Sequence, residues 1–101
     1  MLNQQNKDLC RAIISLHDTT HQTKLVIEEC SELIKAICKC ERDEYGVTQE
    51  HFNNFIEELA DVIVMCQQML LIFNVSMDDI NRMANAKLLR TLERGNTVER
   101  H

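Results

Sequence analysis

Apolar side chains recur along this chain at intervals of three and four residues, which is the period of an amphipathic α-helix. One example is the series Val26, Cys30, Leu33 and Ile37, spaced four, three and four residues apart. The pattern predicts an all-α fold with four helices, at about residues 3–17, 20–42, 49–73 and 77–94. We expect these helices to pack as a bundle.

Capping residues mark the ends of the expected helices. Thr19, Thr48 and Ser76 each stand where a side-chain oxygen can accept a hydrogen bond from the first turn of a helix. The stretch 43–49 interrupts the apolar pattern and separates the second helix from the third. Gly95 is typical of the residue that stops a helix, so we expect the fourth helix to end beside it.

The composition agrees with a helical fold in one domain. The 101 residues include no Pro and only two Gly, whereas all-β sandwiches and barrels need many turn residues. A chain of this length has room for one hydrophobic core. It has no linker or low-complexity tract, and we therefore predict a single domain spanning residues 1–101.

Charge and cysteine usage limit the partners and the compartment. The 16 acidic and 11 basic residues give a net charge of −5, which argues against nucleic acid as a partner. No long uncharged apolar stretch and no signal-peptide core is present, so we expect no membrane association. The five cysteines form no C-x-x-C pair, which favours reduced thiols in a cytoplasmic protein over a zinc site or disulfides.

An internal similarity duplicates a pair of carboxylates. Segment 27–34 aligns without gaps with segment 56–63, and both lie in expected helices. The candidate residues are Glu29 and Glu32 in the first segment and Glu58 and Asp61 in the second. On a helical wheel, Glu29 and Glu58 fall inside the apolar stripes of their helices, with the other two at the stripe edges. If the two helices pack antiparallel, the carboxylates meet at the middle of a hairpin.

Carboxylates on an apolar face need compensation, because a buried ionised group without a partner costs several kcal/mol. Basic partners or bound metal ions would supply it, and oxygen ligands spaced three residues apart suit hard cations such as Mg²⁺ or Mn²⁺. A di-iron site is disfavoured because no Glu-x-x-His motif occurs and all four histidines lie outside both segments. The alternative is that the glutamates form ordinary surface salt bridges.

The fourth expected helix carries a group of polar and cationic side chains. These candidate substrate-binding residues are Asn85, Lys87, Arg90 and Arg94. The three cations fall on one side of the helical wheel, where they would suit a polyphosphate held together with metal ions. They would equally suit a helix end, where positive charge complements the dipole. No glycine-rich phosphate loop is present, so metal and side chains would have to hold the phosphates.

In this order and spacing the motifs resemble the MazG-like branch of the all-α nucleoside triphosphate pyrophosphohydrolases. That family is similar in having E-x-x-E, a spacer, E-x-x-D, and then a helix with N-x-K-x-x-R. Here 25 residues separate the first two motifs, and the third begins at Asn85. The resemblance covers about residues 20–95.

The resemblance implies an Mg²⁺-dependent hydrolase, with Mn²⁺ as a possible substitute, that cuts a nucleoside triphosphate between the α and β phosphates. By motif match the four carboxylates would be metal ligands, and one of them, or a hydroxide that they help to generate, would activate the attacking water. Lys87 and Arg90 would hold the phosphates, and Asn85 would contact phosphate or sugar. Arg94 is added from the helical wheel and is not a residue of the family motif. The sequence does not indicate which base is preferred.

The third expected helix also predicts assembly. Residues 62–66 and 69–73 are apolar nearly all round, and such a helix must be covered on more than one side. We expect a homodimer or a dimer of dimers, as the family also implies. The alternative is that this helix is internal to a single chain.

Two other functions are compatible with the same residues. The first is a non-catalytic helical module that binds metal or nucleotide through the acidic segments. The second is a structural bundle whose apolar stripe recognises a partner helix. The carboxylates inside apolar stripes argue against the structural bundle, and nothing in the sequence separates the enzyme from the binding module.

Overall fold

The computed structural model describes the backbone of residues 1–99 and the side chains of residues 1–95, and over this range it is helical with no strand. The last two residues of the predicted domain lie outside the described part. The helices are α1 (Gln4–Leu16), α2 (Thr19–Glu41), α3 (Gln49–Ile72) and α4 (Met77–Glu99). The predicted all-α fold with four helices is therefore confirmed, with most bounds within one or two residues.

Side-chain caps begin the helices largely as predicted, with one difference. The Thr48 hydroxyl accepts the His51 amide at 3.2 Å, and the Ser76 hydroxyl accepts the Asp79 amide at 3.2 Å. Asp18, rather than Thr19, caps α2 and accepts the His21 amide at 2.7 Å. A carboxylate is favoured there because negative charge stabilises the N-terminal end of a helix.

The predicted end of α4 at Gly95 is wrong. The helix continues through Gly95 to Glu99. A glycine stops a helix by adopting a positive φ, and among the described residues only Gly46 and Asn74 do so. Asn74, with φ 52°, redirects the chain after α3, and the Val75 amide closes that turn on the Leu70 carbonyl at 2.9 Å.

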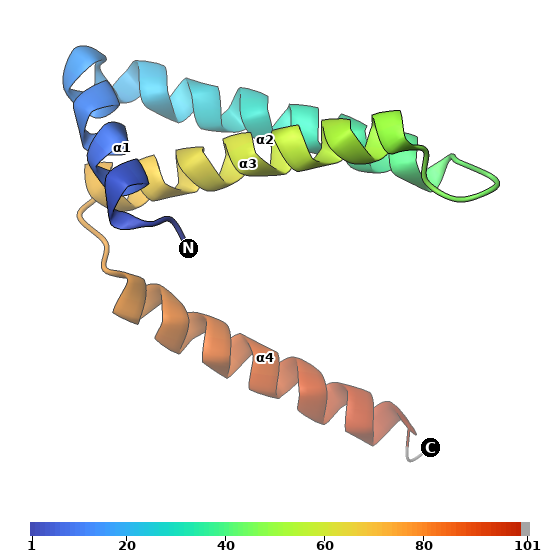
Figure 1. The fold of residues 1–101 in the computed structure, drawn as a ribbon. Coiled ribbons are helices and arrows are strands. Elements are labelled where there is room, and N and C mark those ends of the chain that lie inside the picture. Colours follow the sequence, from blue (N-terminus) through green and yellow to red (C-terminus); the bar gives the residue numbers. More distant parts are fainter. Residues whose placement is uncertain (100–101) are drawn as a thin grey trace.

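Helices α2 and α3 form a long antiparallel hairpin, and α1 lies across its open end (Figure 1). The register of the hairpin is such that the numbers of two residues facing each other on α2 and α3 add up to 90 or 91. Gln22 donates a hydrogen bond to Gln68, and the Cys40 thiol donates to the His51 carbonyl at 3.5 Å. This register places segment 27–34 opposite segment 56–63, as an antiparallel pairing of the duplicated motifs requires.

The fully buried part of the chain is small. Among the residues whose side chains are described, those buried are Cys10, Gln22, Ala36, Met65, Gln67 and Gln68. All of them lie on α1, α2 or α3. The core of a single chain is therefore the hairpin seam together with the place where α1 docks on it.

Helix α4 stands apart from this core. The axis turns by 118° between α3 and α4, and α4 diverges from the hairpin instead of packing along it (Figure 1). Large apolar side chains on α4 are left exposed, among them Leu88 at 68% and Leu92 at 62%. A bundle with all four helices packed together is not formed within the described part of one chain.

No single helix in the described range is long and apolar enough to cross a membrane. Helices α3 and α4 satisfy the criteria of length and composition only when taken together as a bent pair.

Candidate metal and phosphate site

Three carboxylates from the two facing segments meet in the hairpin. Glu29 on α2 and Glu58 and Asp61 on α3 each offer an oxygen, and these oxygens all lie within 4.8 Å of one another. We call these three residues the acidic cluster. Glu58 and Asp61 are three residues apart and so project from neighbouring positions of one helix. The antiparallel register then places Glu29 opposite Asp61. The expectation that the four carboxylates of the duplicated motifs meet is confirmed for three of them, and Glu32 is not part of the cluster.

The surroundings of Glu29 make its charge unfavourable. The side chain is half-buried, and desolvation is the largest cause that raises the pKa of this carboxyl group. The negative charges of Asp61 and Glu58, a hydrogen bond with Asp61 and the charge of Glu32 raise the same pKa further. Without a counter-charge, the Glu29 carboxyl group therefore holds its proton more readily than an isolated glutamate does.

A divalent cation fits this donor set. Carboxylate oxygens are the ligands that hard cations prefer, and the metal–oxygen bonds of Mg²⁺ and Ca²⁺ are about 2.0–2.6 Å long. Oxygens within 4.8 Å of one another can therefore reach one ion with small side-chain movements. A bound cation would also remove the repulsion that raises the pKa of Glu29, so that metal and proton compete for the cluster.

Glu32 lies outside the acidic cluster. Its side chain is exposed and forms an ion pair with Lys35 at 3.2 Å. It remains close enough for its charge to act on Glu29. Glu28 and Glu57, which precede Glu29 and Glu58 in the chain, are both exposed.

The cations predicted to bind phosphate gather on α4, away from the acidic cluster. Lys87, Arg90 and Arg94, together with Thr91, line one hollow along this helix. Asn85 is exposed on α4 but does not line the hollow. Because α4 diverges from the hairpin, the described structure does not bring any of these residues to the acidic cluster.

The two groups nevertheless lie at similar distances from the turn that joins their helices. Asp61 comes 11 residues before the last residue of α3, and Lys87 comes 10 residues after the first residue of α4. At about 1.5 Å per residue, both are roughly 15 Å from the turn. Helices α3 and α4 therefore carry groups of opposite charge at similar distances from the turn that joins them.

Sequence reasoning missed a second set of polar residues in the hairpin seam. Gln22 and Gln68 are 1% and 2% exposed and hydrogen-bond each other across the seam. The Gln68 side chain also hydrogen-bonds the Cys10 thiol, whose pKa is raised by burial and lowered by that bond. Gln22 and Gln68 lie seven residues from Glu29 and Asp61, on the same helix faces. That i±7 relation to the acidic residues was the signal that could have found them.

The fold and the acidic cluster together describe an all-α protein with three carboxylates between two helices that could hold a metal ion. The sequence model of the MazG nucleotide pyrophosphohydrolase domain matches residues 17–92, about three quarters of the chain. The chain therefore belongs to the MazG nucleotide pyrophosphohydrolase domain family. No curated protein and no solved structure matches it.

Proposed function

We propose that this protein is an Mg²⁺-dependent nucleoside triphosphate pyrophosphohydrolase. It would cleave the bond between the α and β phosphates of ribo- or deoxynucleoside triphosphates and release the monophosphate and pyrophosphate. The observation that carries the proposal is the acidic cluster, whose oxygens lie within 4.8 Å of one another between α2 and α3. Membership in the MazG domain family supports the reaction class.

Glu29, Glu58 and Asp61 would hold the metal ion, with Glu32 as a further ligand from the edge of the site. When bound, Mg²⁺ or Mn²⁺ would neutralise phosphate charge and act as a Lewis acid. The half-buried position of Glu29 and Glu58 limits the access of water, which strengthens the electrostatic interactions in the site. A carboxylate of the cluster would accept the proton of the attacking water.

Lys87 and Arg90 would bind the phosphates, with Arg94 farther along the same hollow and Asn85 as a contact to phosphate or sugar. A polyphosphate needs fixed positive charge in addition to the metal ion. The similar distances of Asp61 and Lys87 from the turn between α3 and α4 support this role. The α2–α3 hairpin and helix α4 would have to come together around the substrate, either within one chain or between two chains.

We further propose that the protein is a homodimer or a dimer of dimers. Exposed apolar side chains on two separate elements support assembly, among them Ile27 at 71% and Ile34 at 61% on α2 and Leu88 on α4. Large apolar side chains that are this exposed on a hairpin and on α4 favour cover by a second copy of the chain. Elution as a monomer at micromolar concentration in gel filtration would contradict this part of the proposal.

The remaining expectations stay predictions. They are a single domain over residues 1–101, a nucleotide rather than nucleic acid or membrane as the partner, and a cytoplasmic location.

Pyrophosphate release from a panel of ribo- and deoxynucleoside triphosphates, with and without Mg²⁺, tests the proposal. We expect pyrophosphate only when metal is present, and no orthophosphate in the same reactions. Orthophosphate would place the cut at another bond and contradict the reaction. Thermal stabilisation by Mg²⁺ or nucleotide without turnover would instead indicate the non-catalytic binding module.

A further inference from the structure

Two histidine side chains stack on each other at the turn between α1 and α2. His17 caps the end of α1, and His21 lies in the first turn of α2. The centroids of their imidazole rings are 4.9 Å apart, and the ring planes are inclined by 28°. Both side chains are exposed. We call these two residues the histidine pair; it shares no residue with the acidic cluster or with the cations of α4.

Hydrogen bonds hold the backbone on both sides of the histidine pair. The His17 amide donates to the Ile14 carbonyl at 3.3 Å and so closes the end of α1. The Asp18 side chain accepts the His21 amide at 2.7 Å, and the Asp18 carbonyl accepts the Gln22 amide at 3.2 Å. Gln22 is itself only 1% exposed, because it lies in the hairpin seam. The turn therefore presents the two imidazoles from fixed backbone positions.

The distance between the rings matches two imidazoles that share one metal ion. A zinc–nitrogen bond is about 2.0–2.1 Å long, which puts the centroid of a bound imidazole about 3.2 Å from the ion. For nitrogen–zinc–nitrogen angles of about 90–109°, two such centroids are about 4.5–5.2 Å apart. The observed 4.9 Å falls within this interval. Because both side chains are exposed, small rotations can aim one nitrogen of each ring at the same point.

Imidazole donors select a different class of cation from that of the acidic cluster. Imidazole nitrogen suits transition metals such as Zn²⁺, Ni²⁺ and Cu²⁺, whereas Mg²⁺ prefers carboxylate and water oxygens. Among the described residues, the acidic cluster is the one group of three or more ligating side chains. An ion at the histidine pair would therefore complete its coordination with water.

We propose that the histidine pair binds a divalent transition metal of the zinc class, and that the ion acts as a staple across the α1–α2 turn. His17 ends one helix and His21 begins the next, so an ion held by both resists movement of α1 away from the hairpin. Helix α1 packs on α3 and contributes the buried Cys10 to the core. The proposal is independent of the proposed function, since it uses neither the acidic cluster nor a nucleotide.

The imidazole signals of the histidines report directly on binding. Zn²⁺ is titrated into the untagged full-length protein labelled with ¹⁵N-histidine, in excess Mg²⁺ to compete for the acidic cluster. We expect the signals of His17 and His21 to shift together, with one dissociation constant. The signals of His51 should stay in place, because its Nδ1 is already bonded to Asp43 at the other end of the hairpin.

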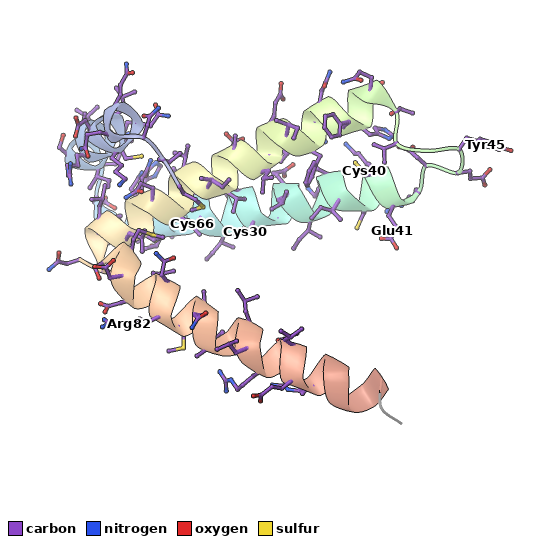
Figure 2. The ribbon with its side chains drawn as sticks, turned by 60° about the horizontal axis from the view of Figure 1, so that its bottom comes forward. Cys30, Cys40, Glu41, Tyr45, Cys66 and Arg82 are labelled. Carbon is purple, nitrogen blue, oxygen red and sulfur yellow. The ribbon has the colours of Figure 1, made fainter. Side chains whose placement is uncertain are left out.

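Substitutions of single histidines test the pair. His17→Gln and His21→Gln each remove one ligand from an exposed position, so both variants should fold. Each should weaken Zn²⁺ binding, followed at the remaining histidine, at least about tenfold. The matched control is His51→Gln, which should bind Zn²⁺ like the wild type. Its carbonyl accepts the Cys40 thiol, and Figure 2 labels Cys40 near the loop end of the hairpin, away from α1.

Amide hydrogen exchange tests the staple. At a free Zn²⁺ concentration of about ten times the dissociation constant, binding suppresses any opening that breaks the site by about tenfold. Exchange in α1 should therefore slow by up to about tenfold in the wild type and stay unchanged in His21→Gln. Exchange in the loop 43–48 should be the same with and without Zn²⁺.

The contrary results are distinct. Unmoved signals of His17 and His21, or a shift of only one of them, would overturn the site, because the Zn²⁺ would then be held elsewhere or by a single imidazole. Joint shifts without slower exchange in α1 would overturn the staple. Neither readout involves pyrophosphate release, so a failure here is distinguishable from a failure of the proposed function.

Discussion

The α2–α3 hairpin and helix α4 are both helical, but they differ in how far their side chains are packed against the rest of the chain. The hairpin has a seam with a defined register, buried side chains and a cluster of three carboxylates. Helix α4 has only exposed or half-buried side chains in its described part, and its cations line a hollow that includes no residue of that cluster. Packing two helices within one chain is therefore enough to form the acidic half of the site. If α4 supplies the phosphate-binding cations, as proposed, a further step of closure or assembly must bring them to the cluster.

The hairpin half is tested most strongly by Glu58→Gln. The substitution removes a ligand and a negative charge with little change in shape, and we expect pyrophosphate release to fall at least about 100-fold. In the absence of metal the variant should be no less stable than the wild type, because Glu58 repels Glu29. Rate assays and thermal melts measure the two effects.

The exposed neighbour Glu57 provides the matched control, since Glu57→Gln changes charge equally on the same helix. Equal loss of activity in both variants would mean that net charge, and not the acidic cluster, supports the reaction.

The α4 half is tested by Arg90→Ala. We expect activity to fall about 10- to 100-fold through the loss of a phosphate contact. The melting temperature should not change, because Arg90 is exposed and lies outside the core. The control is Arg82→Ala, which removes an exposed arginine of the same helix that is paired with Asp79. Wild-type activity in Arg90→Ala would show that α4 does not reach the substrate.

The seam itself is tested by Gln68→Leu. This change leaves the buried Gln22 amide without its acceptor, and we expect unfolding free energy to fall by about 1–3 kcal/mol. The double variant Gln22→Leu/Gln68→Leu should recover part of that loss, because neither partner is then left unpaired. Chemical denaturation of both variants measures the difference, and a double variant that is less stable than the single one would contradict a paired role.

We expect the smallest effect, a slight change in stability, in the loop that joins α2 to α3. Asp43 lies 2.9 Å from His51 Nδ1 and accepts the Thr48 amide at 3.1 Å, and these bonds lower the pKa of the Asp43 carboxyl group. A carboxyl group with a lowered folded-state pKa adds stability above its unfolded value of about 4. That contribution is lost as the pH falls through the lowered value.

Asp43→Asn should therefore melt slightly below the wild type at pH 7, and the gap should close in acid. A gap that is the same at pH 7 and at pH 3 would mean that the charge of Asp43 does not stabilise this loop.

The sequence was sufficient to predict what depends on periodicity and local chemistry. The 3–4 spacing predicted four helices, and the duplicated segments predicted that Glu29, Glu32, Glu58 and Asp61 would meet, which holds for all of them except Glu32. It did not predict the angle of α4, because periodicity assigns a face to each helix but not the direction that the chain takes after Asn74. Nor did it predict that Glu32 points outward to Lys35, since the helical wheel placed it at the edge of the stripe.

Binding of Mn²⁺, followed by electron paramagnetic resonance, tests most directly the claim that the hairpin alone builds the metal centre. The wild type and Arg90→Ala should bind Mn²⁺ with the same affinity, whereas Glu58→Gln should bind it at least about tenfold more weakly. Binding to Glu58→Gln that equals binding to the wild type would contradict the account.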